Sequence, residues 1–231
     1  MMSHFLAFIL IIVLPVWDRF ETRRLKISRD PRVKIQSYQM TIAWLWICAT
    51  IATTAFGWKQ LCTIRVTALE APWLPMGRAA YSLGVMLGVA FFIAAIIPVV
   101  SMRFSAKVRE GFEKQLAALR FFLPGRGEER LWFGFVAISA GVCEEILFRG
   151  FMIRYFQAEP YHLTLTFAVL LSCLFFGTAH LYQGIVGVVQ TTFMGMAFAF
   201  LFLLTGSLAL PMVLHAVTDL KLLLILRKRP G

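Results

Sequence analysis

The residues best suited to chemistry lie in three short segments of the second half of the chain, each inside a long apolar run. A charge at the centre of a bilayer costs at least about 2.5 kcal/mol, so a buried ionisable residue needs a partner or a function. Acids, imidazoles and one guanidinium recur in these segments at helical spacing, a combination that can activate water and stabilise an oxyanion. The segments are residues 144–149 (EEILFR), 176–180 (FGTAH) and 215–219 (HAVTD).

The first segment predicts two carboxyl groups with different surroundings. Glu145 and Arg149 are four residues apart, so they share a helix face and can form an ion pair. Glu144 points about 100° away, and its neighbour one turn on is Phe148 rather than a cation. An apolar setting disfavours the ionised form of a carboxyl group, which suits a general base or a water-activating acid. The alternative is that all three polar residues only join helices together.

The two histidine segments are weaker indications when each is taken alone. His180 and His215 could each be a hydrogen-bonded residue between helices, and Gly177 would let another helix approach closely. His215 and Asp219 are four residues apart and so share a face. Together with Glu144 they have the groups that peptide hydrolysis requires.

In that hypothesis, Glu144 and His180 hold and deprotonate a water molecule. His215 and Asp219 donate to the oxyanion that develops on the scissile carbonyl, or they orient a donor toward it. The Glu145–Arg149 pair holds its helix in register. The sequence leaves open whether Asp219 is protonated.

The three segments resemble the motifs of the CAAX protease and bacteriocin-processing family of intramembrane glutamic endopeptidases. The family's EExxxR, FxxxH and HxxxN or HxxxD motifs match in order and spacing, and the resemblance covers about residues 131–226. It implies a metal-independent peptide hydrolase without a cofactor, acting on a membrane-anchored protein or peptide. One departure is Asp219, where many members have Asn. The implied catalytic residues are Glu144, His180, His215 and Asp219, and the implied structural supports are Glu145, Arg149 and Phe176.

Two alternatives of other classes remain open. A zinc-dependent membrane protease could use two histidines and a glutamate, although the chain has no HExxH segment. A non-catalytic transporter or scaffold could use the same buried charges, although no internal repeat is visible. Sensitivity to chelators would favour zinc.

The elements that position these residues are predicted to be transmembrane helices. Of 231 residues, 59% are hydrophobic and 15% are charged, and the mean hydropathy is +0.76. A helix needs about 20 apolar residues to cross a bilayer. We therefore predict an all-α, polytopic transmembrane bundle with about seven spans and an interfacial helix at 108–122. The expected spans are residues 5–17 (a short, uncleaved first helix), 40–58, 80–102, 131–156, 163–181, 185–204 and 207–226.

The net charge of +11 is explained by topology rather than by nucleic-acid binding. Seven basic residues fall in the predicted loop 18–39, seven in 103–130 and three at 227–229, but only three in 59–79. This bias predicts an outside N-terminus and a cytoplasmic C-terminus, in a bacterial inner (plasma) membrane. We expect a single integrated domain, in which 1–130 supplies helices and basic loops of unassigned role and 131–231 forms the catalytic core. The sequence does not indicate an oligomeric state.

Overall fold

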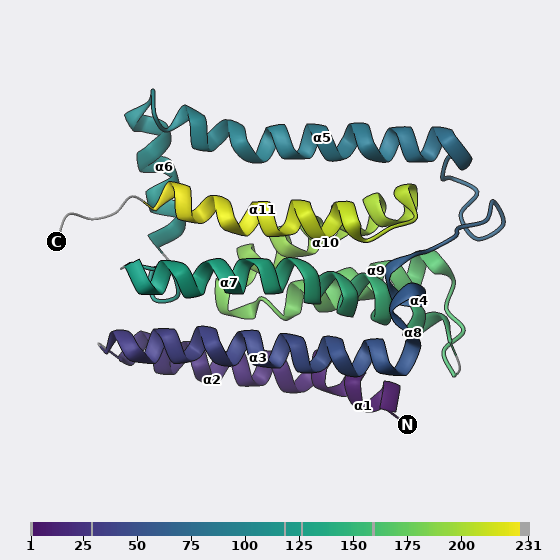
Figure 1. The fold of residues 1–231 in the computed structure, drawn as a ribbon, viewed down its shortest axis with the longest axis horizontal. Helices are drawn as coiled ribbons and strands as arrows, with labels where there is room; N and C mark the ends of the chain where they lie inside the picture. The colour runs from purple at the N-terminus through teal and green to yellow at the C-terminus, as the bar shows by residue number, and fades with distance from the viewer. Residues whose placement is uncertain (1, 29, 118, 126, 159, 227–231) are drawn as a thin grey trace.

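The described part of the protein is almost entirely helical. A computed structural model describes residues 2–28, 30–117, 119–125, 127–158 and 160–226. Within these ranges the only β pairing is an isolated bridge between Thr63 and Ser207. Figure 1 shows long helices running side by side, with α6 lying across one end of the bundle. The predicted all-α membrane bundle is confirmed.

The helices follow the apolar runs of the sequence closely. Five of them are long and apolar enough to cross a membrane: Met2–Ile27, Arg32–Phe56, Gly77–Ser101, Gly127–Gln157 and Leu181–Thr205. Two further helices, α9 and α11, are shorter, so the count of seven spans stays a prediction. The elements are α1 (Met2–Phe8), η1 (Ile9–Val13), α2 (Leu14–Ile27), α3 (Pro31–Phe56), α4 (Trp58–Cys62), α5 (Gly77–Ser101), α6 (Ala106–Ala117), α7 (Gly127–Glu144), η2 (Glu145–Met152), α8 (Ile153–Gln157), α9 (Leu165–Thr178), η3 (Leu181–Gln183), α10 (Gly184–Thr205) and α11 (Ala209–Ile225).

The predicted loop at 18–39 is wrong, because helices occupy most of it. The first helix continues to Ile27, and α3 already begins at Pro31. Asp30 caps α3 by accepting a hydrogen bond from the backbone N–H of Arg32 at 2.9 Å. Arg and Lys are good helix formers, and bases in the last turn of a helix complement its dipole. Hydropathy located the apolar middle of each helix and missed its polar ends.

Successive long helices run in opposite directions, so their connections lie at two ends of the bundle (Figure 1). The α2–α3 connection, α6 and the end of α11 lie at one end, and the connection from α4 to α5 lies at the other (Figure 1). The basic residues expected in 18–39 and 103–130 therefore gather at the same end, and those in 59–79 at the opposite end. Arg29, Arg126 and the bases at 227–229 lie outside the described residues.

Small residues allow the helices that carry the three motifs to pack closely. A Cβ added at Gly141 on α7 would lie 2.7–2.9 Å from the backbone N, Cβ and Cα of Ala216 on α11. A Cβ at Gly177 would lie 2.8 Å from the carbonyl oxygen of Val188 on α10. The prediction that Gly177 lets a helix approach closely is confirmed. Contact at Gly141 brings the end of α7 next to the start of the HxxxD segment.

We expect Gly141→Ala to destabilise the protein. Its new methyl group would overlap the backbone of α11, which cannot move aside as a flexible side chain could. Overpacking typically costs about 1–3 kcal/mol, so the melting temperature in detergent should fall by roughly 2–12 °C. Gly134→Ala is the matched control, since its Cβ would lie 3.8 Å from the nearest atom, Cδ1 of Leu223. Equal melting temperatures for the two variants would contradict this packing.

Candidate active site

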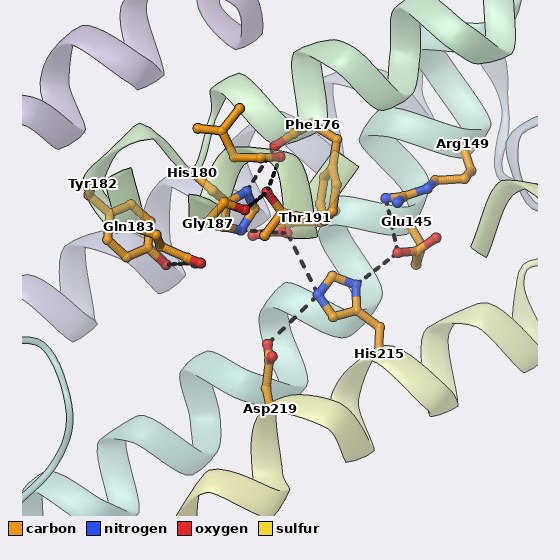
Figure 2. Close-up of polar contacts among 12 residues, drawn as sticks. Glu145, Arg149, Phe176, His180, Tyr182, Gln183, Gly187, Thr191, His215 and Asp219 are labelled. Carbon is orange, nitrogen blue, oxygen red and sulfur yellow. Dashed lines mark hydrogen bonds and ion pairs between the residues drawn. The ribbon is translucent and has the colours of Figure 1, made fainter. Parts of the chain in front are cut away.

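The three motif segments meet in the interior of the bundle, as Figure 2 shows. Glu144 is the last residue of α7, and the helix then widens into the π-helix η2. All eight residues of η2 are buried. Such π turns are rare and often occur at functional sites. The change of helix type falls between the two adjacent glutamates, one of which faces a cavity while the other is enclosed.

Glu145 is the centre of a buried network that links η2 to α11. Its Oε1 lies 3.1 Å from Nη1 of Arg149, which confirms the pairing predicted from their spacing. The same oxygen accepts a hydrogen bond of 2.8 Å from Nδ1 of His215. This second contact was not predicted from the sequence, because it joins residues 70 positions apart. Glu145 therefore also fixes the orientation of an imidazole on another helix.

Arg149 is held mainly by charge and by aromatic faces. Its side chain is 1% exposed, and its guanidinium carbon lies 4.1 Å from the centroid of the Phe176 ring and 5.7 Å from that of Phe198. Such cation–π contacts stabilise desolvated guanidinium groups. The glycine at 195 makes room, since a Cβ there would lie 3.1 Å from Nη2 of Arg149. Phe176 thus contacts the guanidinium of this network, and its role as a structural support stays a prediction.

Glu144 faces two imidazoles and pairs with no cation of its own helix among the described residues. Its Oε2 lies 3.8 Å from Nε2 of His215 and 4.0 Å from Nε2 of His180. These separations are too long for direct hydrogen bonds. Within the described structure, Oε2 is buried and has no hydrogen-bond partner. The site thus brings together a carboxyl group and two ring nitrogens at distances that one water molecule can bridge.

His180 lies in a break between helices, not inside the predicted span 163–181. Helix α9 ends at Thr178, and a short 3-10 turn follows before α10. Nδ1 of His180 lies 2.8 Å from the carbonyl oxygen of Phe176. A carbonyl only accepts, so Nδ1 carries the proton and donates it. In the neutral ring, the unprotonated Nε2 therefore faces Glu144.

His215 presents its other nitrogen to two further carboxyl groups. Nδ1 donates to Glu145, while Nε2 lies 3.7 Å from Oδ2 of Asp219 and 3.8 Å from Oε2 of Glu144. The predicted sharing of one face by His215 and Asp219 is seen. The structure thus brings all four residues predicted to be catalytic into one cluster, while their roles stay predictions.

A cavity of about 470 Å³ opens beside this cluster. Glu144, His180, His215 and Asp219 line it, and most of the remaining wall is apolar. Sequence reasoning missed that helices before residue 131 form part of this wall. Apolar periodicity identifies a buried face but not the element that it meets. The wall residues from the first helix and α3 are Leu10, Leu14, Trp17, Asp18, Thr41, Trp44, Leu45 and Cys48.

Residues 126–220 match the family model described as Type II CAAX prenyl endopeptidase Rce1-like. The match contains all three motif segments, and the resemblance to the CAAX protease family is confirmed. No curated protein and no solved structure matches the chain significantly. Among the residues that the structure describes, no three His, Cys, Asp or Glu side chains are arranged to hold a metal ion.

We expect Arg149→Ala to lower the stability of the protein strongly. Removing the guanidinium leaves the fully buried Glu145 without its cation, and breaking a buried pair costs about 3–5 kcal/mol. Expression yield and melting temperature in detergent would both fall. The control is Arg78→Ala, which removes an exposed arginine at the start of α5. If Arg149→Ala were as well expressed and as stable as this control, the network would not hold the site together.

Proposed function

We propose that this Rce1-like membrane protein is a metal-independent, glutamic-type endopeptidase that cleaves a membrane-associated protein or peptide inside the bilayer. The family implies a peptide hydrolase. The observation that carries the glutamic mechanism is the placement of Glu144 Oε2 within 4.0 Å of two imidazole nitrogens at the wall of a cavity. A carboxyl group without a fixed cation can both take up and release a proton.

In the proposed first step, Glu144 and His180 hold a water molecule between them. Nε2 of His180 accepts a hydrogen bond from the water, because Nδ1 already donates to Phe176. Glu144 takes a proton as the water oxygen attacks the carbonyl carbon of the scissile peptide bond. When the tetrahedral intermediate collapses, the same proton passes to the leaving nitrogen. Glu144 is then ready for the next substrate.

In the same step, His215 and Asp219 would stabilise the negative oxygen of the intermediate. Glu145 holds Nδ1 of His215, so Nε2 is directed toward the cavity that the substrate would occupy. A protonated Nε2 can donate to the oxyanion, and such donors are usually a large part of catalysis. Asp219 either donates as a neutral acid or orients His215 through their 3.7 Å contact.

The proposed setting is a bacterial plasma membrane, with the N-terminus outside and the C-terminus in the cytoplasm. Basic residues concentrate at the bundle end that holds the α2–α3 connection and α6, and cytoplasmic loops carry such an excess. Asp219 lies in the half of α11 that leads to this end, and Leu116 of α6 lines the cavity, so the substrate would be reached from the cytoplasmic half of the membrane.

We expect Glu144→Gln and His180→Ala each to reduce cleavage by about a thousandfold, within the usual range for loss of acid–base catalysis. The substrate is first identified by comparing the membrane proteomes of cells that carry the native protein and of cells that carry Glu144→Gln. An uncleaved precursor should accumulate in the Glu144→Gln cells. Purified variants are then assayed on that precursor. Glu110→Gln, which neutralises an exposed acid on α6, is the control.

Full activity of Glu144→Gln would end the glutamic proposal. Activity that chelators abolish and zinc restores would favour the zinc-dependent alternative. Unchanged melting temperatures show that the losses are catalytic rather than structural.

Asp219 offers a separate test of the oxyanion side. An asparagine there donates a hydrogen bond whatever the pH, so Asp219→Asn should keep activity within about threefold of wild type. Asp219→Leu removes donor and acceptor and should lose about a hundredfold in kcat, the scale seen for single oxyanion donors. Full activity of both variants would show that Asp219 does not act on the oxyanion or on His215.

A further inference from the structure

The first helix presents one face to the cavity that contains Glu144. Leu10, Leu14, Trp17 and Asp18 all line this cavity. Their spacing of four, three and one residues places them on a single stripe of a helix. The stripe is apolar up to Trp17 and then ends in a carboxyl group. Asp18 therefore belongs to the wall of the proposed active site, although it lies outside all three motifs.

Asp18 has no cation of its own among the described residues. It lies in Met2–Ile27, a helix apolar enough to cross a membrane, where a carboxylate normally requires a partner. Glu21, one turn on, has such a partner, since Oε1 lies 3.4 Å from Nη1 of Arg24. No described side chain forms a comparable ion pair or hydrogen bond with Asp18, which leaves its carboxyl group free to bind a ligand in the cavity.

The charged groups of the cavity wall are mainly acidic, in contrast to the chain as a whole. The described wall contains three acids, Asp18, Glu144 and Asp219, against one lysine, Lys221, and the two histidines of the site. The whole chain, however, has 23 Lys and Arg against 12 Asp and Glu. Most other wall residues are apolar. Such a cavity is suited to a ligand that combines apolar groups with a positive charge.

We infer that Asp18 determines specificity by binding a Lys or Arg side chain of the substrate close to the cleaved bond. The inference rests on the proposed function, because the ligand is the substrate of the same site. The aliphatic stem of such a side chain can pack on Leu14 and Trp17 while its charged end reaches the carboxylate. Charge-assisted hydrogen bonds are among the stronger polar contacts, particularly away from bulk water.

Acylated, fluorescence-quenched peptides in proteoliposomes test this inference. The peptides differ at a single position, which holds Lys, norleucine or Glu. This position is moved along the peptide one residue at a time. At one of these positions, the KM of wild type for the Lys peptide should be about tenfold lower than its KM for the norleucine peptide. A tenfold difference corresponds to about 1.4 kcal/mol of binding free energy. Asp18→Asn should remove this difference and leave kcat within about twofold. Asp18→Lys should prefer the Glu peptide.

Glu21→Gln is the matched control, because it neutralises an acid on the same helix that is already paired with Arg24. It should keep the preference for Lys. Asp18→Glu retains the charge and should keep the preference for Lys. This result would show that the loss in Asp18→Asn comes from the missing charge and not from misfolding. A Lys preference that survives Asp18→Asn, or the absence of any Lys preference in wild type, would overturn the role of Asp18 while leaving hydrolysis intact.

A binding measurement tests the role of Asp18 independently of the proposed cleavage reaction. The same peptides are added to Glu144→Gln protein with and without Asp18→Asn, and the shift in melting temperature is measured. Stabilisation by the Lys peptide that depends on Asp18 would support the inference even if wild type cleaved no peptide. Equal stabilisation by the Lys and norleucine peptides would refute it.

Discussion

Every feature of the site depends on how the protein buries charge inside an apolar bundle. Two adjacent carboxyl groups enter the interior on one helix, and the structure treats them differently. Glu145 is enclosed by Arg149 and His215, at 3.1 and 2.8 Å, and is itself fully buried. Glu144 lies 3.8 and 4.0 Å from two imidazole nitrogens and faces a cavity. The first acid makes a stable framework, and the second is left able to exchange a proton.

The framework also sets the directions of the two histidines. The carbonyl of Phe176 and the carboxylate of Glu145 each accept a hydrogen bond from an Nδ1–H group, so both Nε2 atoms face Glu144. His180 reaches its position because α9 stops at Thr178, inside the bundle, instead of continuing as a full span. A break of this kind is tolerated at membrane depth where the backbone is buried in protein or lines a cavity.

The cavity combines both halves of the chain. The motif residues lie on α7, η2, α9, the turn after α9 and α11, and the first helix and α3 add further residues to the wall. The N-terminal half is thus more than an anchor, since it determines which groups a ligand would meet. Basic residues lie mainly in segments outside the cavity, whereas acidic residues lie at its wall, and the two groups are suited to different roles. In the proposed function, the basic segments would orient the chain in a membrane, whereas the buried acids would act on what enters the cavity.

The sequence by itself determined the helical membrane class, the approximate positions of the apolar segments and the Glu145–Arg149 pair. These depend on local rules, namely apolar run length and the four-residue spacing of one helix face. The polar ends of α2 and α3 were missed because hydropathy detects only the apolar middle of a helix. Only the tertiary structure decided that Glu145 holds His215, that His180 lies in a helix break and that Asp18 lines the cavity. Those contacts join residues distant in the chain, and their geometry is set by how closely whole helices pack rather than by any spacing along one of them.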